Sequence, residues 1–363
     1  MNNKILVFVG FLMICLAACS SGTIPVPEPG TALPSPLPAE PATLTVMTHD
    51  SFAASEEVIQ QFEVENNARV QFLFAGDTGT ALNRAILAGD TPLADVFYGL
   101  DNTFLSRALD EDIFESYISP WLPEIPDQFK LDPQNRALPV DYGDVCLNYD
   151  IAYFEQASLD PPQSLTDLTE PEYRGLLVVE NPATSSPGLS FMFATVAVFG
   201  EEGYLDYWQS LVKNDLLVVN SWETAYYTEF SGSAGRGPRP IVVSYGSSPP
   251  FEVIYAETPL SEPPTAAVTN DDTCFRQIEF VGILRNTKNR ELAEKWVDFM
   301  LSPVFQADLP LQMFVFPVNP EAELDETFVK FLSVPEKPAY LDPAEIAENR
   351  ERWIQEWTQT VLR

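Results

Sequence analysis

The sequence predicts an α/β protein with two lobes, each a mostly parallel sheet flanked by helices, joined by segments that cross between them. From residue 43 onward, short apolar strand patterns alternate with single helical patterns, which is typical of right-handed βαβ units and parallel sheets. This alternation occurs twice along the chain. Residues 43–363 also exceed the usual size of a single hydrophobic core, so two lobes are expected.

The first lobe is expected over residues 43–140. Its patterns run in the order strand 44–48, helix 55–65, strand 70–74, helix 80–88 and strand 93–98. The second lobe is expected over residues 141–273. Its patterns are a strand at 176–179, a helix after Pro187, a strand at 216–219, a helix near 224–230 and a strand at 241–243.

Two extended segments, residues 137–148 and 274–284, are predicted to cross between the lobes and form the hinge. Residues 274–363 are then expected to return to the first lobe and to end in a helix. Asp342 can cap that helix, Pro343 suits its first position, and Glu345 completes a capping box.

The N-terminus predicts export. Residues 1–18 form a signal peptide in which Lys4 precedes an apolar run shorter than the roughly 20 residues of a membrane span. The run ends in Leu-Ala-Ala before Cys19, which resembles a lipobox, so Cys19 is the expected lipidation site; an ordinary signal peptide is the alternative. Residues 19–42 are proline-rich and predict a semi-rigid tether. The protein is therefore expected to be extracytoplasmic and anchored by lipid to the membrane, in the periplasm or on an outer face.

The composition is strongly acidic, with 53 Asp and Glu against 20 Lys and Arg and a formal net charge of −33. Such a charge argues against nucleic-acid partners and favours cationic ligands, although it also suits a merely soluble surface. Of four cysteines, Cys15 leaves with the signal and Cys19 is lipidated. Cys146 and Cys274 remain, and an oxidising compartment favours their pairing.

Ligands of open parallel sheets bind beyond the carboxyl ends of the strands, so the residues there are candidates for the site. In the first lobe these positions hold Asp50, Asp77 and Asp101. Any one of them is explained equally well as a helix cap. Three together predict a negatively charged rim.

The second lobe offers hydroxyls and rings at the equivalent places. Ser185 lies in a Thr-Ser-Ser-Pro-Gly string before a helix, where helix amides and hydroxyls suit an anion such as phosphate. Trp222 with Tyr226 behind it, and Tyr245 with Phe251 further on, offer aromatic faces that stack on flat cations. Core packing is the alternative for each ring. The combination predicts a site for a flat cation, with or without a phosphate.

The sequence gives little support to catalysis. His49 is its single histidine, and neither a Walker loop, a dinucleotide glycine fingerprint nor a paired CxxC motif occurs. We therefore expect no catalytic residue, no metal site and no cofactor.

Several short strings, in order along the chain, resemble the periplasmic thiamine-binding proteins of ABC importers. These strings lie at residues 48–54, 99–102, 141–143, 184–189, 221–226, 316–318 and 353–357. The resemblance runs from about residue 44 to residue 363. It implies a type II periplasmic-binding-protein fold that closes around thiamine, thiamine monophosphate or thiamine diphosphate and hands it to an ABC transporter permease.

The resemblance also implies roles for individual residues. The ligand rings would lie among Trp222, Tyr245, Phe251, Phe314 and the carboxylate of Asp77, with Ser185 at the phosphate end. Phe251 and Phe314 stand where the family has tyrosine and tryptophan, so stacking is kept while two polar groups are lost.

The cysteine pair is not part of the family pattern. Because Cys146 and Cys274 lie on the crossing segments, a disulfide within or beside the hinge is expected.

Two alternatives stay open. The same module could bind another cationic solute, a polyamine or iron. A thiaminase-like enzyme shares this kind of fold and uses a cysteine nucleophile; Cys146 is the candidate for that role, and a disulfide would silence it.

Overall fold

The computed structural model describes residues 40–233 and 237–363. The expected signal peptide at residues 1–18, the lipidation site Cys19 and nearly all of the tether at 19–42 lie outside these residues. Within the described ranges, no helix is long and apolar enough to cross a membrane.

The first lobe is built from alternating strands and helices. They are β1 (Ala42–Thr48), α1 (Glu56–Asn66), β2 (Ala68–Phe74), α2 (Thr78–Ala88), β3 (Val96–Asp101), α3 (Leu105–Asp110) and β4 (Phe114–Glu115). Local caps set the helix starts. The Ser55 side chain accepts from the backbone N–H of Val58 at α1, and the Asp77 side chain accepts from that of Thr78 at α2.

The second lobe repeats this plan after the long strand β5 (Leu138–Asp150). It contains α4 (Ile151–Ala157), β6 (Leu177–Glu180), α5 (Ser186–Lys213), β7 (Leu217–Val219), a π-helical turn (Thr224–Glu229), β8 (Ile241–Tyr245), α6 (Ser248–Ile254) and β9 (Thr265–Val268). The chain continues through β10 (Phe275–Leu284), α7 (Arg290–Leu301), α8 (Pro303–Met313), β11 (Phe316–Pro317), α9 (Glu326–Phe331) and α10 (Pro343–Val361).

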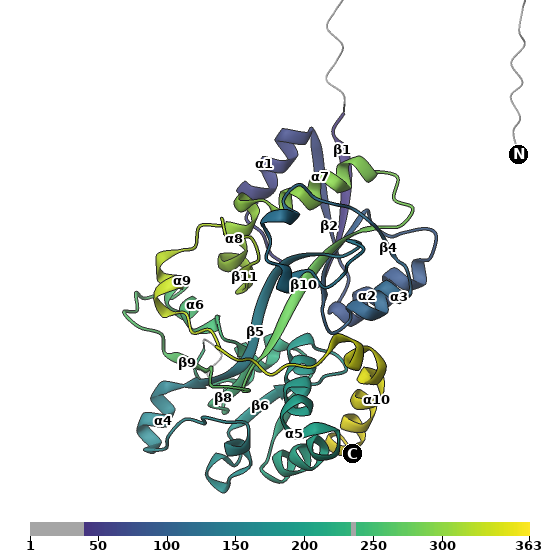
Figure 1. Ribbon diagram of the computed structural model, residues 1–363. Coiled ribbons are helices and arrows are strands. Elements are labelled where there is room, and N and C mark those ends of the chain that lie inside the picture. Colours follow the sequence, from purple (N-terminus) through teal and green to yellow (C-terminus); the bar gives the residue numbers. More distant parts are fainter. Residues whose placement is uncertain (1–39, 234–236) are drawn as a thin grey trace, which may run out of the picture. The chain divides into compact units, whose positions relative to one another are not determined.

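The strands form one path in the order β2-β1-β3-β10-β5-β8-β6-β7. The outer strands of each lobe pair in parallel, β2-β1-β3 on one side and β8-β6-β7 on the other. Between them β10 and β5 pair antiparallel and run side by side from one lobe into the other (Figure 1). They match the crossing segments expected at residues 137–148 and 274–284, and the two-lobed α/β fold is confirmed.

A disulfide and an ion pair fasten the crossing strands to each other. Cys146 and Cys274 form a disulfide, with their Cα atoms 4.3 Å apart. Two positions further along the ladder, Arg276 donates from Nε and Nη2 to the two Asp144 oxygens, each at 2.9 Å. The expected cysteine pairing is therefore present at the junction of the crossing strands.

Each lobe has its own hydrophobic core. In the first, α7 and α8 cover the sheet, and Phe62 meets the edge of the Trp296 ring at 4.9 Å. In the second, the long helix α5 supplies Phe193 and Trp208, both fully buried.

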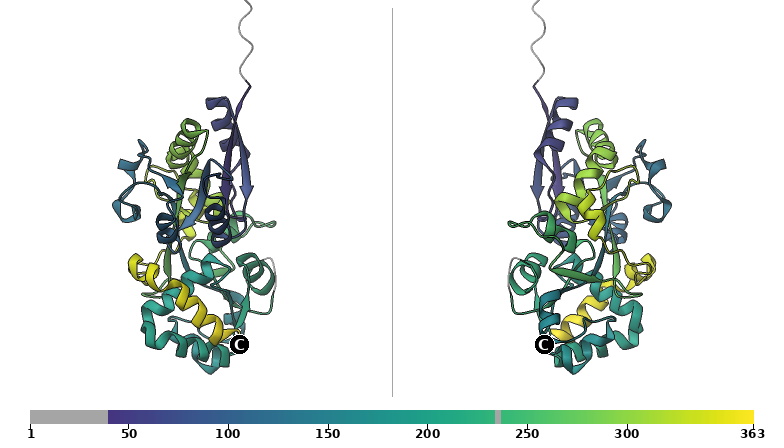
Figure 2. Two further views of the ribbon diagram at one scale, coloured as in Figure 1. Left: turned by 90° about the vertical axis from the view of Figure 1, so that its right-hand side faces the viewer. Right: turned by 90° about the vertical axis from the view of Figure 1, so that its left-hand side faces the viewer.

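The C-terminal helix corrects one expectation. It was expected to return with residues 274–363 to the first lobe, but α10 packs along α5 in the second lobe (Figure 2). Trp357 meets the edge of Trp208 at 5.2 Å, and Trp353 meets Phe193 at 5.9 Å. An apolar stripe shows which face of a helix is buried but not which partner buries it, and here the large rings of α5 are that partner.

Candidate functional site

A cavity of about 270 Å³ lies where the two lobes meet. Its lining comes from residues 49–51 and 77–78 of the first lobe, residues 184–187, 220–223 and Tyr245 of the second, Gln277 and Glu279 on β10, and residues 312–315 at the C-terminal end of α8 and directly after it. Most of these segments follow the carboxyl ends of strands or precede helices, where parallel sheets place their ligand sites.

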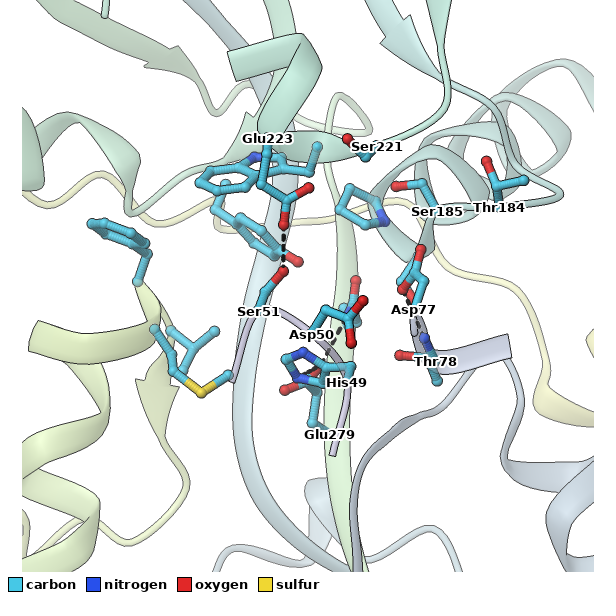
Figure 3. A pocket seen from close by; sticks show the side chains of 18 of the residues that line it. His49, Asp50, Ser51, Asp77, Thr78, Thr184, Ser185, Ser221, Glu223 and Glu279 are labelled. Atoms are coloured by element: carbon cyan, nitrogen blue, oxygen red, sulfur yellow. Dashed lines mark hydrogen bonds and ion pairs between the residues drawn. The ribbon is translucent and has the colours of Figure 1, made fainter. Parts of the chain in front are cut away.

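The first-lobe wall is acidic. His49, Asp50 and Ser51 follow β1, and the backbone N–H of Gly76 donates to Asp50 Oδ1 at 2.9 Å. Asp77 caps α2 by accepting from the Thr78 N–H at 2.7 Å, so its second oxygen is left for other partners. The backbone thus fixes two carboxylates at the cavity rim (Figure 3).

The second-lobe wall is aromatic. Trp222 donates from Nε1 to Ser244 Oγ at 2.9 Å and stacks on Tyr226, with the ring centroids 5.1 Å apart. Tyr245 ends β8 close to the crossing strand β5, where a Cβ at Gly143 would lie 2.7 Å from its ring. Glycine at position 143 therefore makes room for this ring.

One hydrogen bond joins the two walls. The Ser51 hydroxyl donates to Glu223 Oε1 at 2.7 Å, and Figure 3 shows the two side chains approaching from opposite sides of the cavity. Ser51 belongs to the first lobe and Glu223 to the second, so this bond forms only when the lobes are close together.

Burial and mutual repulsion shift the protonation of the acids here. Desolvation raises the pKa of the Asp77 carboxyl to about 6. The negative charges of Asp101 and Glu223 add to this rise, whereas the Thr78 N–H and His49 oppose it. Burial also works against a charge on Glu279, but His49, Tyr98 and Asp141 together outweigh it and lower the pKa of that carboxyl. The cavity thus holds several carboxylates that a cation would stabilise in their ionised form.

Comparison with known proteins decides the family. The model of the bacterial extracellular solute-binding protein family matches residues 91–334, which is more than half of the chain. This chain belongs to that family.

Individual relatives of this solute-binding protein agree along most of its length. The thiamine-binding periplasmic protein of Escherichia coli (strain K12) is 31% identical over 334 residues, 91% of this chain and 96% of the relative. The thiamine-binding periplasmic protein of Brucella suis biovar 1 is 30% identical, and the match covers 88% of this chain and 92% of the relative. Among solved structures, a periplasmic thiamin binding protein superposes with a TM-score of 0.75 at 28% identity, over 89% of this chain and 97% of the other.

A more distant likeness supports the fold alone. The ferric binding protein from Campylobacter jejuni superposes with a TM-score of 0.71 at 20% identity, over 87% of this chain and 99% of that chain. The type II periplasmic-binding fold expected for this solute-binding protein is therefore confirmed.

The structure brings most of the predicted ligand residues together. Asp77, Ser185, Trp222, Tyr245 and Phe314 all line the cavity between the lobes. Their roles toward a ligand remain a proposal.

Two predicted residues line a different cavity. Phe251 and Tyr226 border a neighbouring space of about 560 Å³, which shares Trp222 and Phe314 with the first. Phe251 meets the Phe314 ring edge-on at 3.9 Å, and Tyr226 donates its hydroxyl proton to Glu252 at 2.8 Å. The rings of Trp222 and Phe314 therefore separate two adjoining aromatic cavities.

Asp101 lies below the site rather than on its rim. It was placed after a strand at residues 93–98, but β3 runs from Val96 to Asp101, so this aspartate is inside the strand and fully buried. It accepts from the Thr103 N–H and from the Ser186 hydroxyl, both at 2.7 Å. Asp101 therefore supports Ser186, which does line the cavity.

Several cavity residues were not singled out from the sequence, among them Gln277, Glu279 and Glu223. Gln277 and Glu279 lie two positions apart on β10, and Glu223 follows Trp222. Gln277 and Glu279 occupy alternate positions of the crossing strand and so lie on one face of it, which was the available signal for these two.

The enzyme alternative loses its candidate nucleophile in this structure. Cys146 is fully buried, is bonded to Cys274, and lies outside the set of residues that line the cavity. A thiolate is needed for attack, and a disulfide sulfur has none.

Glu180 is an unusual carboxyl behind the cavity. It ends β6 fully buried, and neither of its oxygens finds a hydrogen-bond partner in another described residue. Burial raises the pKa of this carboxyl well above its ordinary value, and Asp77 and Glu223 add to the rise. The solute-binding protein is therefore expected to carry Glu180 in its neutral form over an extended pH range.

Glu180→Gln is expected to stabilise the protein as the pH rises. The folded state favours the neutral acid, so the contribution of Glu180 to the free energy of unfolding is complete below the ordinary pKa and is lost as the pH rises to the folded-state pKa. Glutamine does not titrate, so the variant escapes this loss. Its free energy of unfolding relative to wild type should therefore grow by about 1.4 kcal/mol per pH unit across that window. Urea unfolding at a series of pH values measures it, with Glu155→Gln on the exposed face of α4 as control. A difference that does not vary with pH would contradict the assignment.

Proposed function

We propose that this protein captures thiamine or one of its phosphates in the cavity between the lobes and delivers it to the permease of an ABC importer. The observation that carries the proposal is that Asp77, Trp222, Tyr245 and Phe314 border one cavity. Thiamine is a flat cation, and carboxylates opposite aromatic faces are the groups that attract such a molecule. The names of the relatives support the same ligand.

The position of each group suits a different part of that ligand. A positively charged ring would lie between the acids of the first-lobe wall and the rings of the second. Ser185 precedes the first turn of α5, where helix amides favour a phosphate. Asp77 and Glu223 lie nearby and disfavour a second negative charge, so we propose that affinity falls as phosphates are added.

The anchoring of the protein is part of the proposal. The string ending in Cys19 supports a lipid anchor, and the proline-rich residues 19–42 would hold the binding lobes away from the membrane surface. Labelling with a lipid precursor tests this: wild type should incorporate it, and Cys19→Ser should not.

A ligand panel tests the proposed function. A ligand that binds only the folded protein raises stability by RT ln(1 + [L]/Kd), about 2.7 kcal/mol at a hundredfold excess over Kd. We expect thermal unfolding to shift upward with thiamine and less with its mono- and diphosphate. Mass spectrometry of ligand released from the purified protein provides an independent readout.

The same panel contains the competing ligands. Spermidine tests the polyamine alternative, because acids and rings also suit a linear cation, and ferric citrate tests iron. A shift with spermidine or iron and none with thiamine or its phosphates would refute the proposal. Incubation with thiamine and a nucleophilic base, followed by a search for pyrimidine adducts, tests the thiaminase-like alternative.

A further inference from the structure

His49 is a histidine inside an acidic ligand cavity. It is the single histidine of the sequence, it follows β1, and it lines the cavity while only 7% exposed. Its Nε2 has no hydrogen-bond partner among the described residues, and the nearby Glu279 Oε1 lies 3.6 Å away (Figure 3). A buried imidazole nitrogen facing a carboxylate at this distance forms an ion pair once the ring is protonated.

The surrounding structure holds this ring in place. A Cβ at Gly99 would come within 2.1 Å of the imidazole, and the Tyr98 ring lies 5.9 Å from it, centroid to centroid. Gly99 has φ of +89°, a conformation that glycine adopts without strain. The imidazole is therefore packed against β3 on one side and faces Glu279 of β10 on the other.

Acidic groups from each neighbouring element face the ring. Glu279 comes from β10, Asp77 from the start of α2 and Asp101 from β3, and all three favour a proton on His49. Burial alone would lower the pKa of the imidazole, but these carboxylates outweigh it and raise the pKa above its ordinary value.

Two further groups complete the cluster behind the ring. The Tyr98 hydroxyl lies 2.6 Å from Asp141 Oδ2 and 3.1 Å from Glu279 Oε2, so its one proton is shared between these two acceptors. Burial and the Glu279 charge raise the pKa of the Asp141 carboxyl well above its ordinary value, which favours its neutral form. The negative charge that the imidazolium balances is therefore that of Glu279 in the cavity.

We propose that His49 determines the charge specificity of the site: its imidazolium balances the cavity acids in the unliganded protein, and a cationic ligand binds as the ring gives up its proton. This inference rests on the proposed binding of a thiamine cation. The guest's positive charge and the imidazolium would compete for the same carboxylates at short range, and like charges in a buried site repel.

The proposal fixes the direction of the pH dependence. Bound ligand lowers the pKa of His49, so a proton is released on binding between the pKa values of the bound and free states. Affinity rises with pH across that window, by about tenfold for each unit by which the pKa is lowered, and levels off above it. Burial raises the pKa of Asp77 to about 6, and its ionisation adds a rise in affinity of the same sign, so the two contributions must be separated by variants.

The single histidine makes the test direct. NMR of the ring C–H signals, on protein without a histidine tag, follows His49 from pH 5 to 9 in the free and thiamine-saturated states. We expect the pKa to be lower in the complex by at least half a unit. Calorimetry in two buffers of different ionisation enthalpy should then record proton release on binding.

Two variants assign the released proton. His49→Gln, which keeps a neutral polar side chain, should flatten the affinity profile above the pH range in which Asp77 ionises, and it reports any titration of the ligand itself. Asp77→Asn should bind more weakly but still release the His49 proton. A His49 pKa that is unchanged or higher in the complex, or an unaltered pH profile in His49→Gln, would overturn the inference alone. Absence of thiamine binding at every pH would overturn both the proposed function and the inference about His49.

Discussion

Replacing Trp222 by alanine should weaken thiamine binding by roughly 10- to 100-fold, or about 1.4–2.7 kcal/mol, with little effect on folding. Trp222 lines both aromatic cavities, stacks on Tyr226 and lies 6.2 Å from the Phe314 ring, centroid to centroid. Its removal takes away the largest aromatic face of the site. It also joins the two cavities into one space that fits the ligand less closely.

Isothermal titration on the variant and wild type measures this effect. Trp222→Phe should lose less, because it keeps an aromatic ring while giving up the hydrogen bond to Ser244 and part of the stacking area. Trp121→Ala is the matched control, since Trp121 packs on the first-lobe core and does not line the cavity. Equal affinity for wild type and Trp222→Ala, with both folded by circular dichroism, would remove Trp222 from the site.

Removing the disulfide should cost about 2–4 kcal/mol of the free energy of unfolding. Cys146 and Cys274 are 128 residues apart in sequence, so the bond closes a long loop and restricts the unfolded chain. Both residues are fully buried, so Cys146→Ala with Cys274→Ala is preferable to serine, which would bury hydroxyl groups.

Urea unfolding of the double variant and of reduced wild type measures this contribution by two routes. The Arg276–Asp144 pair and the backbone ladder still hold β5 against β10 in both proteins. We therefore expect thiamine binding at saturating concentration to survive while stability falls. If neither route lowers stability by as much as about 1 kcal/mol, the bond adds little to the hinge.

The crossing strands were predictable because two extended segments, residues 137–148 and 274–284, lie between the parts of the chain assigned to the two lobes. The bounds of β3 were predicted wrongly: the pattern indicated a strand at residues 93–98, whereas the strand in the structure is Val96–Asp101. The reason lies far along the chain: Leu100 and Asp101 pair with Phe280 and Glu279 of β10, which extends the strand. Local pattern cannot report a pairing made by residues so distant in sequence.

The candidate site was predictable where a residue follows a strand, as with Asp77, Trp222 and Tyr245. It was not predictable where contacts between distant parts of the chain determine which cavity a residue lines. The sequence did not divide the aromatic residues between two cavities, because the Trp222 and Phe314 rings that separate them come from opposite parts of the chain. Nor did it reveal Glu279, whose importance comes from its position opposite His49.

The placement of α10 has a consequence for biosynthesis. Trp353 and Trp357, the innermost side chains of that helix, fill the second-lobe core beside Trp208 on α5. During translation, α5 leaves the ribosome long before these tryptophans exist, so the part of its apolar face that they cover has no native partner until α10 is made. We therefore expect this core to be completed only after the chain is fully synthesised.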